Sequence, residues 1–303
     1  MLSQLPSVFL DVVAPVFAIV AIGWALGPRL GLDPKTLSRA AYYVLVPAFT
    51  FDVISRSRVP LASAGRMAAY AVATHLAFGA IAFVLARLLR RPRDVAAAWV
   101  MLSVFGNVGN FGLALVRFRL GDAALAPATI YFIVILLTSF VVCVGVASWT
   151  RGGSVPAAVV SVFGTPALVV AVPAALVSAS GAELPLFVTR TVGLLGGAMI
   201  PMMLFVLGVQ LARTRALRPT ADVAAVALLR LVGAPALAWA LAGPFGLAGV
   251  ERASGILQAG MPAAILVAII ATEYDVAPGF VTSAVLFSTL LSLPTLTVLL
   301  ALV

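Results

Sequence analysis

The chain has 303 residues, of which 63% are hydrophobic and only 10% are charged. A soluble domain has about 45–50% apolar and about 25% charged residues, so a soluble globular protein, which needs polar residues to cover its surface, is excluded. The formal net charge is +9, but the basic residues form short clusters between apolar stretches and no basic face with aromatics, which excludes nucleic acid as a partner. This composition suits a chain embedded in a lipid bilayer.

Ten apolar stretches have roughly the 20-residue length that a helix needs to cross a bilayer. The connections between them are short and contain Gly, Pro and Arg, so none can hold a soluble domain. The sequence therefore predicts an all-α polytopic membrane protein with ten transmembrane helices. In chain order, the predicted spans cover residues 8–26, 37–54, 67–89, 95–116, 124–149, 157–177, 186–211, 221–241, 255–271 and 280–303.

Basic residues in the loops predict the orientation, because cytoplasmic loops carry an excess of Lys and Arg. With the N-terminus outside the cytoplasm, the cytoplasmic loops carry eleven basic residues: Arg29, Lys35, Arg39, Arg87, Arg90, Arg91, Arg93, Arg151, Arg213, Arg215 and Arg218. The outer loops then carry seven: Arg56, Arg58, Arg66, Arg117, Arg119, Arg190 and Arg252. This bias predicts that both termini lie outside the cytoplasm, in a bacterial-type cytoplasmic (inner) membrane.

The two halves of the chain resemble each other at a nearly constant offset. Four pairs of residues occur in the same order, 151, 154, 153 and 153 positions apart: Pro15 and Pro166, Pro47 and Pro201, Asp122 and Asp275, Ser139 and Ser292. Because each half contains five predicted spans, the second half must be inverted relative to the first. We therefore expect two five-helix repeats, residues 1–150 and 151–303, in the inverted arrangement common among secondary transporters.

Corresponding spans of the two halves are interrupted by residues that disfavour a helix. The fourth span contains Gly106-Asn107-Val108-Gly109-Asn110-Phe111-Gly112, and the ninth contains Gln258-Ala259-Gly260-Met261-Pro262-Ala263. Glycine and proline are costly within a helix, and the N-termini of broken half-helices attract anions. The candidate substrate-binding residues are Asn107, Gly109, Asn110, Gln258, Gly260 and Pro262. In the alternative interpretation, the glycines serve close packing and the asparagines bond between helices.

Two ionisable residues lie within predicted spans, where charges are usually functional. Arg230 could attract a carboxylate or neutralise the C-terminus of a half-helix, and His75 could titrate near neutral pH and couple transport to protons. Alternatively, His75 bonds between helices and Arg230 extends to the membrane surface. With one His and one Cys, no metal site is predicted. No phosphate-binding loop or nucleophile elbow indicates an enzyme, and we expect no cofactor beyond a coupled H⁺ or Na⁺.

Four stretches carry a further resemblance. They are Leu45-Val46-Pro47-Ala48-Phe49; Gly106 to Ala114 followed by Leu120-Gly121; Ile200-Pro201-Met202-Met203-Leu204 with Leu207-Gly208; and Met261-Pro262-Ala263-Ala264 followed by Phe287-Ser288-Thr289-Leu290-Leu291-Ser292-Leu293. In this order they resemble the auxin efflux carrier family, which includes bacterial malate and malonate permeases and the plant auxin carriers. One departure is Ala114, where relatives more often have Pro, so the break in the fourth span would depend on Gly109 and Gly112.

The resemblance implies a scaffold of spans 1, 2, 6 and 7 and a moving transport unit of spans 3–5 and 8–10. Helices 4 and 9 would cross at their broken centres, and Asn107, Asn110 and Pro262 would line the site. Such carriers move small organic anions (mono- and dicarboxylates or auxin-like indole acids) by an elevator-type alternating-access mechanism. Small-residue faces of the scaffold would allow a homodimer.

Two alternative functions remain open from the sequence. A sodium-coupled symporter of the bile-acid type would need carboxylates among the oxygen ligands at the crossing, where the sequence has amides. A membrane sensor or partner that does not transport would have no reason to break two helices at the same depth.

Overall fold

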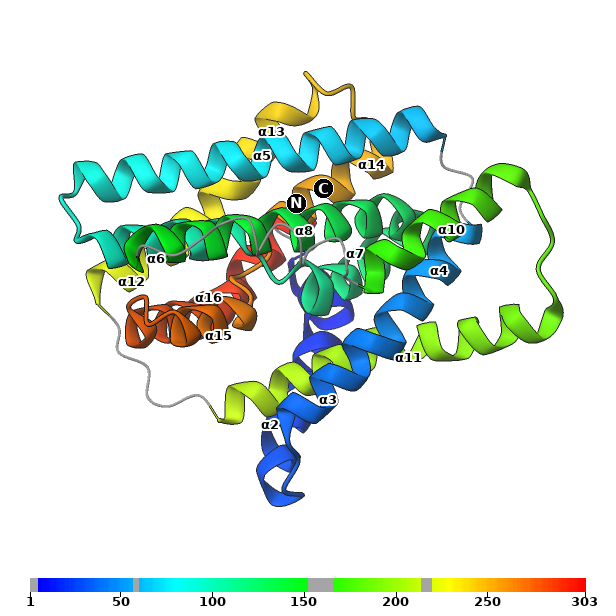
Figure 1. Ribbon diagram of the computed structural model, residues 1–303, viewed down its shortest axis with the longest axis horizontal. Helices are drawn as coiled ribbons and strands as arrows, with labels where there is room; N and C mark the ends of the chain where they lie inside the picture. The colour runs from blue at the N-terminus through cyan, green and yellow to red at the C-terminus, as the bar shows by residue number, and fades with distance from the viewer. Residues whose placement is uncertain (1–4, 57–59, 152–165, 214–219) are drawn as a thin grey trace.

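The computed structural model describes residues 5–56, 60–151, 166–213 and 220–303, and this part of the chain is helical throughout, without a strand (Figure 1). The helical elements of the first half are α1 (Leu5–Val8), η2 (Phe9–Val13), α2 (Ala14–Arg29), α3 (Pro34–Ala40), η3 (Ala41–Leu45), α4 (Val46–Arg56), α5 (Leu61–Leu88), α6 (Arg93–Val104), η4 (Val108–Gly112), α7 (Leu113–Leu120), η5 (Asp122–Ala124) and α8 (Leu125–Arg151). Those of the second half are α10 (Pro166–Ser180), α11 (Leu186–Ala212), α12 (Ala221–Leu228), η6 (Leu229–Gly233), α13 (Ala234–Ala242), α14 (Gly249–Ala259), α15 (Ile265–Glu273) and α16 (Pro278–Leu302).

Seven helices in the described part are long and apolar enough to cross a bilayer. They cover Phe9–Arg29, Pro34–Arg56, Ala62–Leu88, Asp122–Thr150, Leu186–Ala212, Ala221–Ala242 and Pro278–Leu302. The described residues thus confirm the expectation of an all-α polytopic membrane protein. Two further predicted spans, 95–116 and 255–271, are each divided into shorter pieces, of which α6 has 12 residues and α15 has 9. The predicted span 157–177 lies partly outside the described residues, and the rest of it belongs to α10.

Three of the π-helical stretches, whose turns are wider than those of an α-helix, precede a proline. Pro15 follows η2, Pro47 follows η3 and Pro235 follows η6, each two residues after the π-helical stretch ends. A proline lacks the N–H that would bond to the carbonyl four residues earlier, and its ring collides with that carbonyl in a regular α-helix. Widening the preceding turn relieves the collision without breaking the helix.

The helices pack in two groups. α2, α3, η3, α4, α10 and α11 form one network of contacts, whereas α5, α6, α8, α12, α13, α14, α15 and α16 form a second. In Figure 1 the second group includes the long helix α5 with α6 and α8 beneath it, and α2, α3, α4 and α11 lie below and to the right. The groups meet where α11 contacts η4, α4 contacts α8 and η2 contacts α16. Phe17 of α2 also packs edge-on against Phe111 of η4, with ring centroids 5.0 Å apart.

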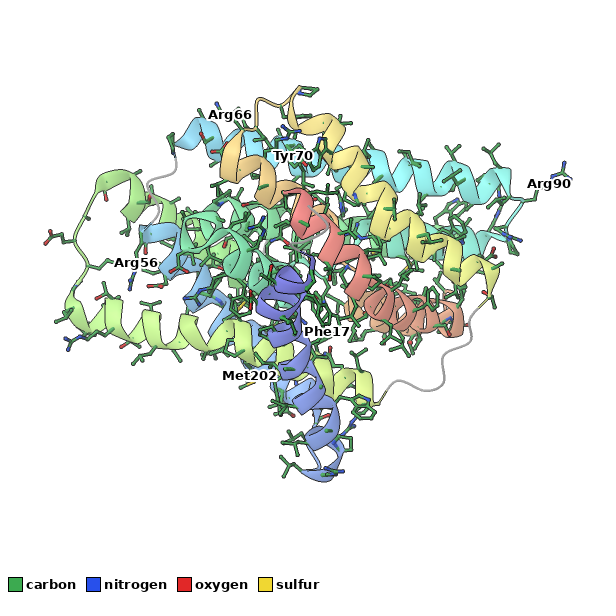
Figure 2. All side chains as sticks on the ribbon, turned by 180° about the vertical axis from the view of Figure 1, so that it is seen from behind. Phe17, Arg56, Arg66, Tyr70, Arg90 and Met202 are labelled. Atoms are coloured by element: carbon green, nitrogen blue, oxygen red, sulfur yellow. The ribbon has the colours of Figure 1, made fainter. Side chains whose placement is uncertain are left out.

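Charged side chains concentrate at the ends of the helices. Figure 2 shows Arg66 and Arg90 at the edges of the molecule and Phe17 within its body. Arg56 forms an ion pair with Asp52 one helical turn earlier, at 2.7 Å, at the end of α4. Arg91 bonds to Asp222 at 2.5 Å and so connects the loop after α5 with the start of α12.

Glycines allow α2 and α11 to lie in backbone contact. A Cβ on Gly208 of α11 would lie 2.0 Å from the carbonyl oxygen of Val20, and one on Gly23 of α2 would lie 2.1 Å from the carbonyl oxygen of Phe205. Close approach through small residues is a common way for membrane helices to associate, because lipid provides no hydrophobic drive between them. The backbones of α2 and α11 therefore lie in direct contact at Gly23 and Gly208.

This contact predicts that Gly208→Ala destabilises the protein. The added methyl meets backbone rather than a movable side chain, so α2 and α11 must separate, at a cost of about 1–3 kcal/mol. The measurement is the unfolding temperature of the purified protein in detergent. Gly197→Ala in the same helix is the matched control, since nothing lies within 4 Å of a Cβ there. Equal unfolding temperatures for the two variants would contradict the contact.

Candidate functional site

Two helices are interrupted at the centre of the molecule, and the interrupted segments pair with each other. α6 ends at Val104 and η4 begins at Val108, while α14 ends at Ala259 and α15 begins at Ile265. The N–H of Asn107 donates to the carbonyl of Pro262 at 2.7 Å, and the N–H of Ala264 donates to the carbonyl of Phe105 at 2.8 Å. Gly106 and Ala263 thus form an isolated antiparallel bridge. The pairing satisfies backbone groups that would otherwise be unbonded in a water-poor interior.

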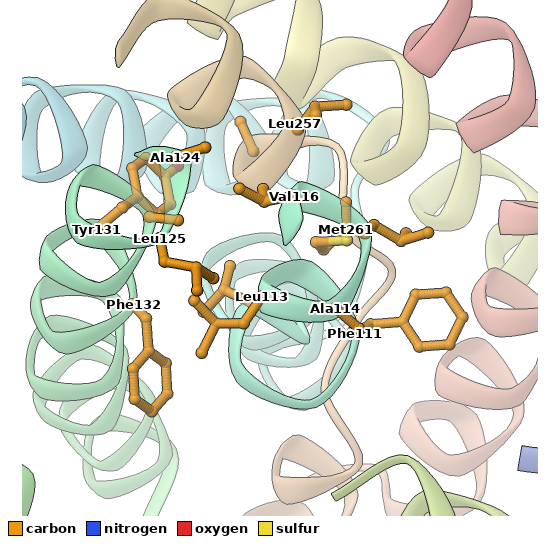
Figure 3. Packing of buried hydrophobic residues seen from close by; sticks show 14 of the residues in the cluster. Phe111, Leu113, Ala114, Val116, Ala124, Leu125, Tyr131, Phe132, Leu257 and Met261 are labelled. Atoms are coloured by element: carbon orange, nitrogen blue, oxygen red, sulfur yellow. The ribbon is translucent and has the colours of Figure 1, made fainter. Parts of the chain in front are cut away.

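The glycines of the fourth span have a different role from the predicted one. The expectation that the break depends on Gly109 and Gly112 is wrong, because both lie in η4, after the break. A Cβ on Gly109 would lie 2.8 Å from the Phe132 ring, and one on Gly112 would lie 1.9 Å from Oε1 of Gln258. Their role in the structure is close packing. Figure 3 shows the apolar packing around this segment, with Phe132, Leu113 and Leu257 among the side chains.

Gly106 is the glycine that the break itself requires. A Cβ at this position would lie 1.9 Å from Nη2 of Arg230. Arg230 is buried, with 5% of its surface exposed, so it does not extend to the membrane surface. Its Nε donates to the carbonyl of Met261 at 2.9 Å, and its Nη1 donates to the carbonyl of Ser103 at 2.6 Å.

Arg230 therefore places a positive charge where two helices end. Ser103 lies in the last turn of α6, and Met261 follows the end of α14. The C-terminus of a helix carries unpaired carbonyls and a partial negative charge. The guanidinium of Arg230 bonds to one carbonyl at the C-terminal end of each of the two helices. Of the roles considered from the sequence, this contact corresponds to neutralising the C-terminus of a half-helix.

His75 participates in a polar contact beside the same helix end. Its Nε2 lies 3.0 Å from Oγ of Ser139, and that hydroxyl donates to the carbonyl of Val104 at 3.0 Å. Because a hydroxyl has one hydrogen, which is used on Val104, His75 donates through Nε2 and accepts nothing there. His75 is thus an interhelical hydrogen-bonding residue connecting α5 with α8, and it does not line the cavity described next.

A cavity of about 490 Å³ opens beside the paired breaks. Of the six predicted substrate-binding residues, Asn107, Gly109 and Asn110 line it, whereas Gln258, Gly260 and Pro262 do not. The first packing group contributes Ser38, Arg39, Tyr42, Tyr43, Val46, Met203, Val206 and Gln210. The fourth and fifth predicted spans contribute Phe105, Gly106, Asn107, Val108, Gly109, Asn110, Phe132, Leu136 and Phe140, and α15 with the residue before it contributes Ala264, Ile265, Leu266 and Ile269.

The three predicted residues outside the cavity have structural contacts instead. Gln258 is fully buried, and its Nε2 donates to the carbonyl of Ala128 at 3.1 Å. A Cβ on Gly260 would lie 2.3 Å from Leu299. Pro262 supplies the carbonyl that bonds to Asn107. The alignment of the two halves predicts that these residues lie at the same depth as Asn107. It does not predict which of them face the cavity.

The closed end of the cavity offers hydrogen-bond donors. Asn107 has 5% of its surface exposed, and its Nδ2 has no hydrogen-bond partner among the described residues. The first backbone N–H groups of a helix have no acceptor within that helix. The first residues of η4 and of α15 line the cavity, namely Val108, Gly109, Asn110, Ile265 and Leu266. Of the described lining residues, Arg39 alone is charged. A cavity lined by hydrogen-bond donors, two helix N-termini and an arginine is suited to binding an anion.

Sequence reasoning missed Arg39 as a cavity residue, along with Tyr42, Met203 and Gln210. In the sequence, Arg39 indicates only the orientation of a cytoplasmic loop. Arg39 lies near the interruption at Gly106 and Asn107 only through tertiary packing, because the two segments are about 70 positions apart in the sequence. No local sequence pattern reveals such a contact.

An all-helical membrane protein with two broken, paired helices beside a cavity has the architecture of a membrane transporter. The family model described as "Membrane transport protein" matches residues 8–155 and 155–300, so the chain belongs to this family of transporters. It is similar to a putative malonate transporter of Rhizobium meliloti, with 29% identity over 307 residues that cover 96% of this chain and 94% of the relative.

Two further relatives extend the likeness. An uncharacterized transporter of Methanothermobacter thermautotrophicus is 26% identical over 296 residues, covering 94% of this chain and 95% of that protein. The probable auxin efflux carrier component 1b of rice (Oryza sativa) is 33% identical over 116 residues, which are 38% of this chain and 21% of the plant protein. The resemblance to auxin efflux carriers is thereby confirmed, and the protein is a transporter and not an enzyme.

Proposed function

We propose that the protein is a secondary transporter of small organic anions and that it binds a carboxylate of its substrate in the cavity at the helix crossing. The observation that carries this proposal is the buried Asn107, which lines the cavity together with two helix N-termini and whose Nδ2 has no hydrogen-bond partner among the described residues. An unpaired buried donor is costly unless a ligand bonds to it. The relative named as a putative malonate transporter supports the same class of substrate.

We further propose two inverted five-helix repeats and an elevator-type motion. The breaks fall in the fourth helix of each proposed repeat and pair reciprocally through backbone bonds. The cavity lies between the two packing groups, since Ser38, Val206 and Gln210 belong to one and Phe140 and Ile269 to the other. Movement of the second group against a fixed first group would carry the crossing from one side of the membrane to the other. In the orientation predicted from the loops, the cavity opens toward the cytoplasm, where α3 begins and α11 ends.

The sodium-coupled alternative has less support from the geometry. Arg230 supplies a fixed positive charge to the carbonyls of Ser103 and Met261, at the ends of the half-helices. A bound sodium ion would be coordinated by carbonyl oxygens of this kind, which here are bonded to Arg230. We therefore favour transport without bound sodium. With an inside-negative potential, anion efflux gains about 2.3 kcal/mol per charge per 100 mV.

Asn107→Asp tests the carboxylate site, because it preserves the shape of the side chain and replaces a donor with a negative charge. Like charges in contact cost several kcal/mol, so malonate counterflow in proteoliposomes should fall on the order of 100-fold. Asn107→Ser, which removes the amide without adding a charge, should retain part of the activity. Both variants should elute as monodisperse protein in detergent. Malonate exchange by Asn107→Asp at the wild-type rate and KM would refute the site.

A further inference from the structure

Arg39 is a feature of the cavity that a single carboxylate at the crossing leaves unexplained. It lies in the last turn of α3 and is exposed, so it lies where the cavity opens rather than at its closed end. It forms no hydrogen bond or ion pair with any other residue that the structure describes. A guanidinium always carries its charge and five donors, so this group is available to a ligand.

The helix that carries Arg39 is held in place without using its guanidinium. Asp33 accepts bonds from the backbone N–H of Thr36 at 3.0 Å and from the Thr36 hydroxyl at 2.7 Å, which caps the start of α3. These bonds hold the pKa of the Asp33 carboxyl below its ordinary value, so the cap stays ionised. Nε2 of Gln210 donates to the Ser38 hydroxyl at 3.0 Å, which joins α3 to α11 beside Arg39.

The cavity thus has two separate groups of anion-binding donors. One is the buried Asn107 with the helix N-termini at the closed end, and the other is Arg39 at the opening. The rest of the described lining is neutral and mostly apolar, and it contains no carboxylate that would neutralise Arg39. A monoanion bound at the crossing would leave the arginine without a partner. A guanidinium bonds most favourably to a carboxylate, often through two parallel bonds.

We propose that Arg39 binds a second carboxylate of the substrate and so selects dicarboxylates over monocarboxylates. This inference rests on the proposed carboxylate site at the crossing and adds its specificity-determining residue. Arg39 belongs to the packing group that we propose to be fixed, so it would act while the cavity is open at this end. It is a binding residue for the outer carboxylate, and binding at the inner site does not depend on it.

Half-amides provide the experiment, because malonamate and succinamate match malonate and succinate in size and lack one carboxylate. Affinities of the full-length protein in detergent are measured by calorimetry for both pairs. The wild type should bind a diacid about tenfold or more tightly than its half-amide, the usual scale for a hydrogen-bonded charge. Arg39→Gln should remove this difference by weakening diacid binding alone, and Arg39→Lys should retain part of it. Lys35→Gln is the matched control, since Lys35 is an exposed charge one turn earlier and lies outside the cavity.

The outcomes separate this inference from the proposed function. Arg39→Gln that keeps the preference for diacids would overturn the role of Arg39, as would a Lys35→Gln variant that loses the preference equally. Equal wild-type binding of a diacid and its half-amide would overturn it too, while leaving the carboxylate site at the crossing in place. A wild-type protein that binds none of the four probes would refute both proposals for these substrates.

Discussion

Arg230→Met is expected to abolish transport and to lower the stability of the protein more than any other substitution discussed above. Methionine fills a similar space but leaves the carbonyls of Ser103 and Met261 without their donors. Each unpaired buried acceptor costs about 1–3 kcal/mol, and the two half-helix ends also lose their compensating charge. The expected total is about 2–5 kcal/mol. The unfolding temperature in detergent and counterflow in proteoliposomes measure the two effects.

A second arginine provides the control for Arg230. Arg119 is half-buried, and its Nε donates to the carbonyl of Leu300 at the end of α16, at 2.8 Å. It has the same chemistry at a helix C-terminus but can be replaced there by water, so Arg119→Met should cost less than about 1 kcal/mol. Arg230→Lys, which keeps the charge with fewer donors, should fall between wild type and Arg230→Met. An Arg230→Met protein that unfolds at the wild-type temperature would show that the bonds to both half-helices contribute nothing.

The sequence predicted the positions of the interruptions because glycine, proline and asparagine disfavour a helix by their own chemistry. Asn107 and Pro262, named from the sequence, do meet through a backbone bond at the crossing. The roles of neighbouring residues could not be predicted in the same way. Gly109 and Gly112 resemble helix breakers in the sequence, yet Phe132 and Gln258, which come from other helices, make them packing positions.

Three prolines of this sequence lie just after π-helical stretches. Pro15, Pro47 and Pro235 each follow a π-helical stretch by two residues. The wider turn relieves the collision of the proline ring with the carbonyl four residues earlier. The stretch η4 ends two residues before Ala114, where the resemblance to auxin efflux carriers implies a proline. The wider turn is present in η4 without the proline. Packing of Phe111 against Phe17 and of Gly112 against Gln258 holds it from outside the segment.

Cavity residues from the first packing group were the hardest to predict. Arg39 and Gln210 belong to segments whose sequence shows only the end of an apolar stretch, and their chemistry is typical of a membrane boundary. Their function follows from the packing of α3 against α11 and from the opening of the cavity between the groups. Local patterns therefore indicated the donors at the closed end, whereas the charge at the opening required the tertiary structure.

The second large effect concerns covalent blocking of the cavity. Leu266 is half-buried in the first turn of α15 and lines the cavity. In a Cys143→Ala background, which removes the one native thiol, Leu266→Cys places a thiol at a helix N-terminus. Such a position favours the reactive thiolate. Modification with a small charged methanethiosulfonate should stop counterflow completely, because it fills the space beside the first amides of α15.

Substrate protection of Leu266→Cys is the measurement that tests most directly whether a carboxylate occupies this cavity during transport. The modification rate is followed with and without malonate, succinate or indole-3-acetate, and Lys35→Cys, exposed outside the cavity, serves as the control. We predict that each carboxylate exchanged in counterflow slows modification of Leu266→Cys several-fold and leaves Lys35→Cys unaffected. A carboxylate that is transported but leaves the modification rate of Leu266→Cys unchanged would show that the substrate passes elsewhere.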